Sequence, residues 1–329
     1  MSHPLLSGAV PLLLAPMAGV TDLPYRRLCR EFGATATITE MVSAKALTYG
    51  DKKSLALCGI DPNERPCAIQ LFGHEPQVLA EAAALVAPLT PEGLDINMGC
   101  PVPKIVVGGD GSALMRSPEL IGDIVAAVCR ATALPVSVKL RAGIDGHKNA
   151  VECALAAQQG GAALVTVHGR MREQFYMPSA DWDVIAEVRA ALRIPVLANG
   201  DIDSPQAAKA ALAHTGADGL MIGRAARGNP FLFGEIAYYL QTGTLPDPPP
   251  LELRLSTARR HIHELVAHKG SRIGMLEARG HLGWYFRGLR GAAALRERCN
   301  RLTALHQLDE ILALAEELQG GDPRERQPD

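Results

Sequence analysis

The sequence lacks paired cysteines. Its seven cysteines stand apart, and none belongs to a C-x-x-C pair. The odd number and the spacing argue against a disulfide framework and a structural zinc site, and they favour a reducing compartment. The histidines at 74, 147 and 168 have no ligand spacing with one another, so we expect no metal site.

Long apolar runs are also missing. No run approaches the roughly 18 residues that a membrane-spanning helix needs. The leucines at 12–14 resemble the apolar part of a signal peptide, but no basic start precedes them, and Pro11 and Pro16 interrupt the run. We therefore expect a cytoplasmic protein without a membrane partner.

A large net charge is absent, because 33 basic residues meet 35 acidic ones. The charge is nevertheless unevenly spread. Residues 251–301 carry eleven arginines and lysines against four glutamates, a net charge of +7, whereas residues 1–250 sum to -4 and residues 302–329 to -5. A basic block between acidic flanks indicates a polyanionic partner. The alternative is a solvated helical face whose arginines pair locally.

The first 225 residues alternate short apolar runs with helix-like stretches. The expected strands are residues 10–15, 36–40, 67–71, 94–97, 135–139, 164–168, 195–199 and 219–222. Apolar strands that alternate with helices indicate a parallel sheet buried on both faces. Eight such units in about 240 residues predict a (β/α)8 barrel, the TIM barrel. A doubly wound sheet is the runner-up, but it needs a glycine fingerprint where residues 15–19 read Ala-Pro-Met-Ala-Gly.

The barrel is expected to span residues 1–244, before a proline-rich linker. Beyond the linker, apolar residues recur at helical spacing in 251–268 and 302–318. We therefore predict a small C-terminal all-α domain over 245–319 and a polar, disordered tail over 320–329.

A loop after the fourth expected strand organises the site. The strand delivers Asn97 and then Cys100 onto a loop that contains Pro101, Pro103 and Lys104. Prolines cannot extend a central strand, and a lysine does not belong in a core. These residues predict a reactive group held at a strand end. A small buried thiol that caps a turn is the alternative.

Polar residues follow the other strands as well. In a barrel, the carboxyl ends of the strands form the face that carries the active site. The residues expected there are Pro16, Met17, Glu40, Gln70, Lys139, Arg141, His168, Arg170, Asn199, Gly200, Asp201, Gly223 and Arg224. The loops after the last two strands often bind phosphate, so residues 199–201 and 223–224 predict a phosphorylated cofactor or substrate.

Lys139 has two interpretations. It could form a Schiff base if burial lowered its pKa. It could instead stay charged beside the N1/O2 edge of a flavin, with Gln70 facing the pyrimidine edge.

Seven motifs together resemble the tRNA-dihydrouridine synthase family, and most closely its bacterial B-type branch. They lie at residues 15–22, 39–41, 70–73, 95–101, 167–170, 199–202 and 221–224, and residues 281–288 in the C-terminal segment add to the likeness.

The resemblance implies an FMN-dependent enzyme that reduces uridines in tRNA to 5,6-dihydrouridine, with NADPH as the usual donor and NADH as the alternative. Hydride would pass from flavin N5 to C6 of the uracil, and Cys100 would protonate C5. The residues implied for FMN binding are Pro16, Met17 and Ala18 along the flavin, Gln70 and Lys139 at its pyrimidine edge, His168 nearby, and Asn199, Gly200, Asp201, Gly223 and Arg224 at its phosphate. The residues implied for the substrate are Asn97, Arg141, Arg170, Arg287 and Arg290.

Two other functions stay open. An FMN barrel that acts on a free pyrimidine, like the dihydroorotate dehydrogenases, would not need the basic segment. A flavin-bearing RNA-binding or regulatory protein would use the barrel only as a scaffold.

Overall fold

The structure is a computed structural model in which residues 3–320 are described. The chain divides into two compact units. The first comprises the residues up to Ala225 together with Leu232–Leu245, and the second comprises Ala226–Phe231 together with the residues from Pro246 onward. Of the predicted tail, Gly320 ends the last helix, and residues 321–329 lie outside the described part.

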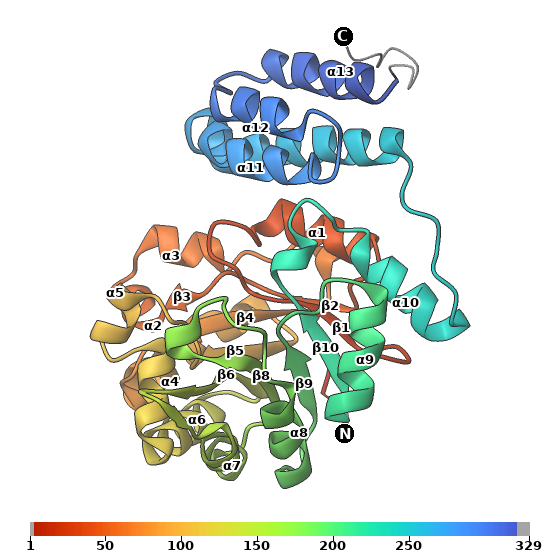
Figure 1. Cartoon of the computed structure of the whole chain (residues 1–329). Helices are drawn as coiled ribbons and strands as arrows, with labels where there is room; N and C mark the ends of the chain where they lie inside the picture. The colour runs from red at the N-terminus through yellow and green to blue at the C-terminus, as the bar shows by residue number, and fades with distance from the viewer. Residues whose placement is uncertain (1–2, 321–329) are drawn as a thin grey trace. The chain divides into compact units, whose positions relative to one another are not determined.

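The first unit is a closed barrel of eight parallel strands (Figure 1). Each strand pairs with the next, and the last pairs with the first. The strands are β1 (Leu12–Leu14), β2 (Ala36–Ile38), β4 (Cys67–Phe72), β5 (Gly93–Asn97), β6 (Val136–Ile144), β8 (Leu164–Met171), β9 (Val196–Asn199) and β10 (Gly219–Ile222). The predicted (β/α)8 fold is thereby confirmed.

Two short strands extend this sheet. β3 (Val42–Ser43) pairs with β4 in parallel, and β7 (His147–Lys148) forms an antiparallel hairpin with the end of β6.

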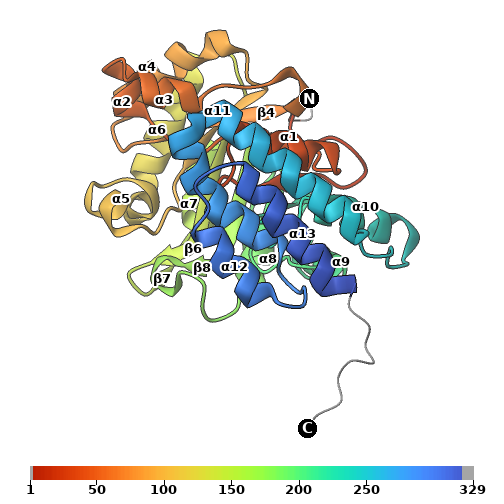
Figure 2. The same ribbon diagram turned by 90° about the horizontal axis from the view of Figure 1, so that it is seen from above.

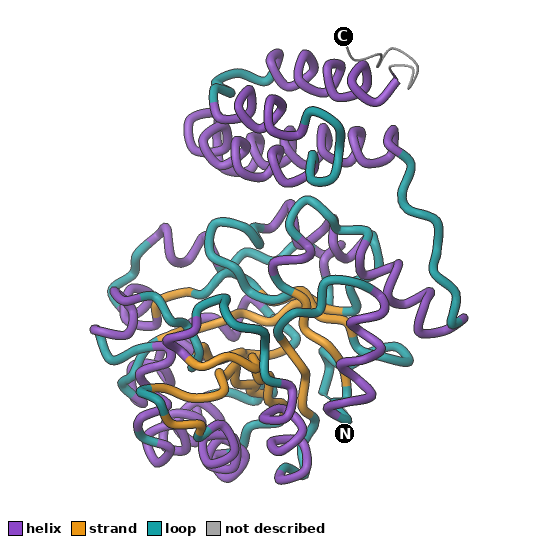
Figure 3. Tube along the Cα trace, viewed as in Figure 1, coloured by secondary structure: helices purple, strands orange, loops and turns teal. Residues whose placement is uncertain are grey.

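Helices surround the strands, as the purple and orange segments of Figure 3 show. The α-helices of this unit are α1 (Leu23–Glu31), α2 (Ala44–Thr48), α3 (Lys52–Leu57), α4 (Pro76–Val86), α5 (Pro103–Val107), α6 (Pro118–Ala131), α7 (Ala150–Gly160), α8 (Trp182–Ala191), α9 (Pro205–Thr215) and α10 (Leu232–Thr242). Short 3-10 turns are η1 (Pro62–Glu64), η2 (Ala87–Leu89), η3 (Gly111–Arg116), η4 (Arg172–Gln174) and η5 (Arg224–Ala226).

Side-chain caps set several helix starts. The Asp22 carboxylate accepts from the backbone N–H of Tyr25, and the Ser117 and Ser204 hydroxyls cap α6 and α9, each of which begins with a proline. A cap and a proline at the first position both favour a helix start there. The chain therefore turns from strand to helix at fixed points, which fixes the loops that carry the polar residues.

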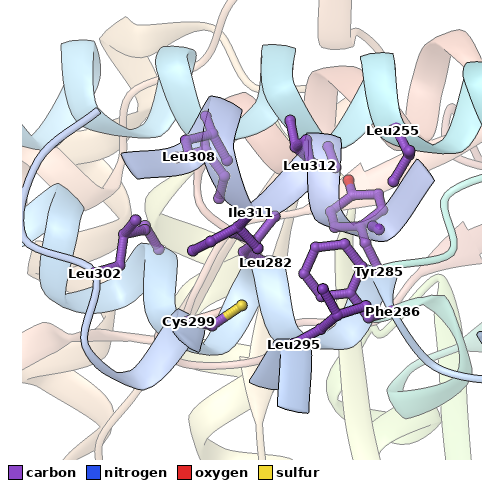
Figure 4. Close-up of a cluster of buried hydrophobic side chains, with 14 of the residues drawn as sticks. Leu255, Leu282, Tyr285, Phe286, Leu295, Cys299, Leu302, Leu308, Ile311 and Leu312 are labelled. Atoms are coloured by element: carbon purple, nitrogen blue, oxygen red, sulfur yellow. The ribbon is translucent and has the colours of Figure 1, made fainter. Parts of the chain in front are cut away.

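The second unit is helical. It contains α11 (Leu251–Tyr285), α12 (Ala292–Asn300) and α13 (His306–Gly320), which pack on one another (Figure 2). α11 is interrupted at Gly270, whose backbone φ is 78°. A buried apolar cluster that includes Leu282, Tyr285, Phe286 and Leu312 joins the three helices (Figure 4). The C-terminal helices that the periodicity predicts are thus present.

The segment Ala226–Phe231 belongs to this helical unit. Gly228 has a φ of 67°, and a Cβ placed there would lie 2.4 Å from the carbonyl carbon of Trp284. The Arg227 guanidinium lies over the Trp284 ring, 5.0 Å from its centroid. Only glycine allows so close a backbone contact with α11.

Within residues 3–320, no helix combines the length and the apolar character that crossing a membrane requires.

Candidate active site

The strand register gathers polar side chains at the carboxyl end of the barrel. Asn97 is paired with Lys139 on the neighbouring strand, and His168 is paired with Asn199. Gln70 lies near the end of β4. Because parallel strands end on the same side of a barrel, these predicted residues meet at one site.

Two side-chain amides hold the start of the segment that carries Cys100, residues 98–112, which we call the cysteine loop. Oε1 of Gln70 accepts a hydrogen bond from Nδ2 of Asn97 at 3.0 Å. Oδ1 of Asn97 then accepts from the backbone N–H of Cys100 at 2.9 Å and from that of Gly99 at 3.3 Å. The amide of Asn97 therefore caps the turn that presents Cys100.

Cys100 is partly exposed, whereas five of the other cysteines are buried and only Cys129 is similarly accessible. Its carbonyl oxygen accepts from both the backbone N–H and the hydroxyl of Ser112. Gly111 lies against it at a φ of +61°, and a Cβ there would be 2.9 Å from the Cys100 carbonyl oxygen. The glycine of this loop is thus required by a close approach to Cys100.

The Cys100 thiol is protonated at neutral pH. Burial raises its pKa above the ordinary value, and this effect outweighs the opposing effects of the Val102 backbone N–H and of the charges on Arg141 and Lys139. A protonated thiol can act as a general acid. The thiolate that forms on proton loss would lie near two cations.

Lys139 donates from Nζ to Oδ1 of Asn199 at 2.9 Å, and Nδ2 of Asn199 donates to the carbonyl oxygen of Met221. Burial, followed by the charge of Arg141, lowers the pKa of Lys139 to about 8, although Asp95 and Cys100 oppose the shift. The ammonium is still mostly protonated at pH 7.

Three arginines, Arg141, Arg170 and Arg224, and the carboxylate of Asp201 form a charged cluster next to Lys139. Oδ2 of Asp201 accepts from Nη2 of Arg170 at 2.6 Å and from the Ala180 backbone N–H, while Oδ1 accepts from Nη2 of Arg224 at 3.1 Å. The Asp201 carboxylate thus orients Arg170 and Arg224. The ring of Tyr176 lies 4.4 Å below the Arg224 guanidinium.

His168 lies among these cations and is neutral. Burial first, and then the charges of Lys139, Arg141, Arg170 and Arg224, lower its pKa well below the ordinary value. Its Nε2 faces Nη1 of Arg170 at 3.4 Å. Since a guanidinium only donates, Nε2 is the accepting nitrogen of the imidazole.

Glycines follow the last two strands, and at Gly200 the glycine allows a close approach. Gly200 has a φ of +115°, and a Cβ there would lie 2.8 Å from Cδ2 of His168. At Gly223 a Cβ would meet Ala15 at 3.6 Å and the sulfur of Met17 at 3.8 Å, which are ordinary contacts. The loop at 16–18 after β1 therefore adjoins the end of β10, with Pro16 and Met17 partly exposed and Ala18 exposed.

The arginines predicted to bind substrate lie in different settings. Arg141 and Arg170 are buried: Arg141 donates to the carbonyl oxygens of Gly99 and Met171, and Arg170 donates to that of Pro178. Arg287 and Arg290 are exposed on the helical unit, where Arg290 also donates to the carbonyl oxygen of Gln319 in the last turn of α13.

Sequence reasoning missed three contributors. Asp95 lies beside Gln70 on the neighbouring strand, His74 contacts Asp110 of the cysteine loop at 2.7 Å, and Tyr176 lies under Arg224. Asp95 could have been identified from the sequence, because a carboxylate inside an apolar strand must find buried hydrogen-bond donors.

A closed barrel with a protonated thiol, a lysine and an arginine cluster at the carboxyl ends of its strands defines a (β/α)8-barrel enzyme. The model of the dihydrouridine synthase family (Dus) matches residues 13–319. The chain belongs to this family, which confirms the resemblance seen in its motifs.

Named relatives of the chain support this family assignment. The chain is 45% identical over 294 residues to tRNA-dihydrouridine synthase B of Xanthomonas campestris, with 89% of each chain covered. It is 43% identical over 292 residues to tRNA-dihydrouridine synthase B of Pseudomonas aeruginosa, with 88% of each covered.

Solved structures share the barrel. A 2-naphthoyl-CoA reductase matches with a TM-score of 0.54 at 12% identity, over 72% of this chain and 52% of the other. Histamine dehydrogenase from Rhizobium sp. 4-9 matches with a TM-score of 0.51 at 12% identity, over 70% and 45%. At this identity the matches show the fold alone.

Proposed function

We propose that this protein reduces uridines of tRNA to 5,6-dihydrouridine, with FMN as its prosthetic group, NADPH as the electron source and Cys100 as the general acid. The observation that carries the proposal is the placement of a partly exposed, protonated thiol at the same barrel end as Lys139, Gln70 and the arginine cluster, in a chain of this family.

The charge of the residues around His168 suits the phosphate group of FMN. Four cations, Lys139, Arg141, Arg170 and Arg224, act on His168, and only the last two pair with the carboxylate of Asp201. Such an excess of positive charge suits a phosphate group. The residues that would hold the phosphate are Asn199, Gly200, Asp201, Gly223 and Arg224, with Asp201 acting through the arginines that it orients.

The residues also fit a flavin ring. Its pyrimidine edge offers both donors and acceptors; the amide of Gln70 can donate and accept, and the ammonium of Lys139 donates. Pro16, Met17 and Ala18 would line the ring, with His168 nearby as a neutral group. When bound, FMN supplies the electron pair that reduces the 5,6 double bond of uracil.

The protein's own groups then complete the reduction. Asn97 would face the target base, and Cys100 would donate its proton to C5. Arg141 and Lys139 lie close enough to Cys100 to lower its pKa, so they would stabilise the thiolate that remains. Because the uracil must leave its stack in tRNA, binding has to offset a cost of a few kcal/mol.

We assign that binding to the predicted C-terminal domain, residues 245–319, together with Arg141 and Arg170 at the barrel. Residues 251–301 carry the net charge of +7, and contacts to phosphates release counterions and favour association. Because tRNA is processed in the cytoplasm, the proposal also places the protein there.

The test is direct. The purified protein is examined for a flavin absorption spectrum and then incubated with NADPH and tRNA from cells that lack the gene, and dihydrouridine is mapped in the product. We expect a yellow protein that forms dihydrouridine in tRNA and leaves free uracil and orotate unchanged. A colourless protein that refuses added FMN overturns the cofactor assignment. Turnover of a free pyrimidine but not of tRNA overturns the substrate assignment.

A further inference from the structure

Asp95 lies in the middle of the apolar strand β5 and is completely buried. Both of its carboxylate oxygens accept hydrogen bonds: Oδ1 from the hydroxyl of Ser137 and Oδ2 from Nε2 of Gln70, each at 2.6 Å. Desolvation raises its pKa, and these two donors and the charge of Lys139 oppose the rise. A buried carboxylate is costly, and the packing of a barrel strand does not require one.

Asp95, Gln70, Asn97 and the backbone N–H groups of Gly99 and Cys100 form a series of hydrogen bonds. Gln70 gives its amide nitrogen to Asp95 and therefore turns its oxygen to Asn97. Asn97 gives its nitrogen to that oxygen and therefore turns its own oxygen to the backbone N–H groups of Cys100 and Gly99. Because both carboxylate oxygens of Asp95 act as acceptors, Asp95 sets the order of donor and acceptor along the whole series.

We propose that Asp95 is a positioning residue: its carboxylate fixes the amide orientations of Gln70 and Asn97 and thereby holds the loop that presents Cys100. The inference rests on the proposed function only in taking Cys100 as the acid. An isolated side-chain amide has two orientations of similar energy, and one of them would turn the nitrogen of Asn97 toward two N–H groups.

The series predicts how substitutions combine. In D95N, the new amide can keep its oxygen toward Gln70 and give its nitrogen to Ser137, whose hydroxyl can accept as well as donate. The original order stays available in D95N, and the N–H groups of Cys100 and Gly99 still favour it, but position 95 no longer enforces it. In N97D, the new carboxylate cannot donate to Gln70, so Gln70 faces a carboxylate on each side with only one amide nitrogen to offer. The series then loses one bond unless a carboxylate takes up a proton.

The double variant D95N/N97D reverses the series without breaking it. The amide at position 95 donates to the oxygen of Gln70, and the nitrogen of Gln70 donates to the carboxylate at position 97. That carboxylate still accepts from the N–H of Cys100. D95N should therefore rescue N97D.

The experiment compares the wild type, D95N, N97D, D95N/N97D and S137A as purified full-length proteins. Each is treated with iodoacetamide at neutral pH, and alkylation of Cys100 is followed by mass spectrometry. Cys129, the other partly exposed cysteine, is the internal control in the same digest. Thermal unfolding midpoints are recorded alongside.

We expect Cys100 to be alkylated roughly tenfold faster in N97D than in D95N/N97D, which is the effect of about one hydrogen bond. Cys129 should react equally in all five proteins, and D95N and S137A should stay within about twofold of the wild type. The double variant should also unfold at a higher temperature than N97D.

Equal alkylation of N97D and D95N/N97D overturns the proposal, as does a double variant that fails to fold. An N97D protein that fails to fold while the double variant folds supports it. These readouts need neither flavin nor tRNA, so they judge the role of Asp95 separately from dihydrouridine formation.

Discussion

Nζ of Lys139 on β6 donates a hydrogen bond to Oδ1 of Asn199 on β9 over 2.9 Å. Asn199 is held in this orientation by the carbonyl oxygen of Met221. A neutral amide offsets little of the cost of burying an ammonium, and the pKa of Lys139 is accordingly lowered to about 8, first by burial and then by Arg141. In the protein without a ligand, Lys139 is thus half neutral near pH 8.

The first prediction concerns this lysine. An electron-rich or anionic ring beside Lys139 favours its charged form, so FMN binding near pH 8 should take up a proton. Above pH 8, FMN affinity should then fall by up to about tenfold per pH unit, because neutral lysine must first be protonated. Fluorescence titration of the apoprotein from pH 7 to 9.5 measures this, and calorimetry in buffers of different ionisation enthalpy counts the proton.

K139M is the matched control. It should bind FMN more weakly at pH 7 and show a flatter pH dependence from 7 to 9.5. If the wild type and K139M have parallel pH profiles, Lys139 does not face the flavin.

The second prediction concerns the proton donor. C100A should retain FMN and lower the rate of dihydrouridine formation by about 10²- to 10⁴-fold, which is the usual contribution of a positioned acid. C100S keeps the shape but is a far weaker acid, so it should also be slow. Single-turnover reaction of the reduced enzyme with tRNA separates this step from NADPH oxidation. C129A should match the wild type, and a C100A rate within twofold of the wild type would contradict the assignment.

Strand periodicity was sufficient to predict the barrel and several of the residues that gather at its carboxyl end. Gln70, Asn97, Lys139 and His168 follow apolar runs, and parallel pairing brings such positions together without further information. The same pattern could not predict which of these side chains form hydrogen bonds with one another. The contact of Asp95 with Gln70 joins two strands 25 residues apart, and only the register between the strands decides it.

Arg141 illustrates what the sequence pattern could not predict. The resemblance implies that Arg141 binds the substrate, but it gives no sign that the side chain is buried and donates to the carbonyl oxygens of Gly99 and Met171. Strand β6 also runs on to Ile144, past the expected end at 139, because β7 pairs with it in a hairpin. Both features depend on neighbouring loops whose course the sequence pattern leaves open.

The third prediction concerns Gly200. G200A should lower the free energy of unfolding by about 1–3 kcal/mol, since a side chain at a φ of +115° is strained. It should also displace His168, whose Cδ2 would lie 2.8 Å from the new Cβ, and so weaken FMN binding. Urea unfolding and FMN titration measure the two effects.

G216A is the control for Gly200. Gly216 also has a positive φ, of +62°, but a Cβ there would have nothing within 4 Å. This variant should show only the cost of backbone strain, about 1 kcal/mol, with unchanged FMN binding. Equal effects of G200A and G216A on FMN would exclude the contact with His168 as the cause.

The fourth prediction distinguishes two arginines of the helical unit. Arg287 is exposed, whereas the guanidinium of Arg290 donates to the carbonyl oxygen of Gln319 at 2.6 Å, and its backbone N–H donates to the Gln319 side chain. R287E should therefore weaken tRNA binding and leave the thermal midpoint unchanged. R290E should lower the midpoint as well, because it removes an anchor of the last turn of α13.

Salt dependence shows whether Arg287 contacts a phosphate. If it does, R287E should reduce the slope of log affinity against log salt by roughly 0.7–0.9, the value for one released counterion. R301E makes the same charge change at an arginine already paired with Glu297 at 2.6 Å, so it should alter the slope less. Filter binding from 50 to 300 mM salt gives the three slopes. If R287E and R301E weaken binding equally with equal slopes, net charge rather than the position of Arg287 determines tRNA affinity.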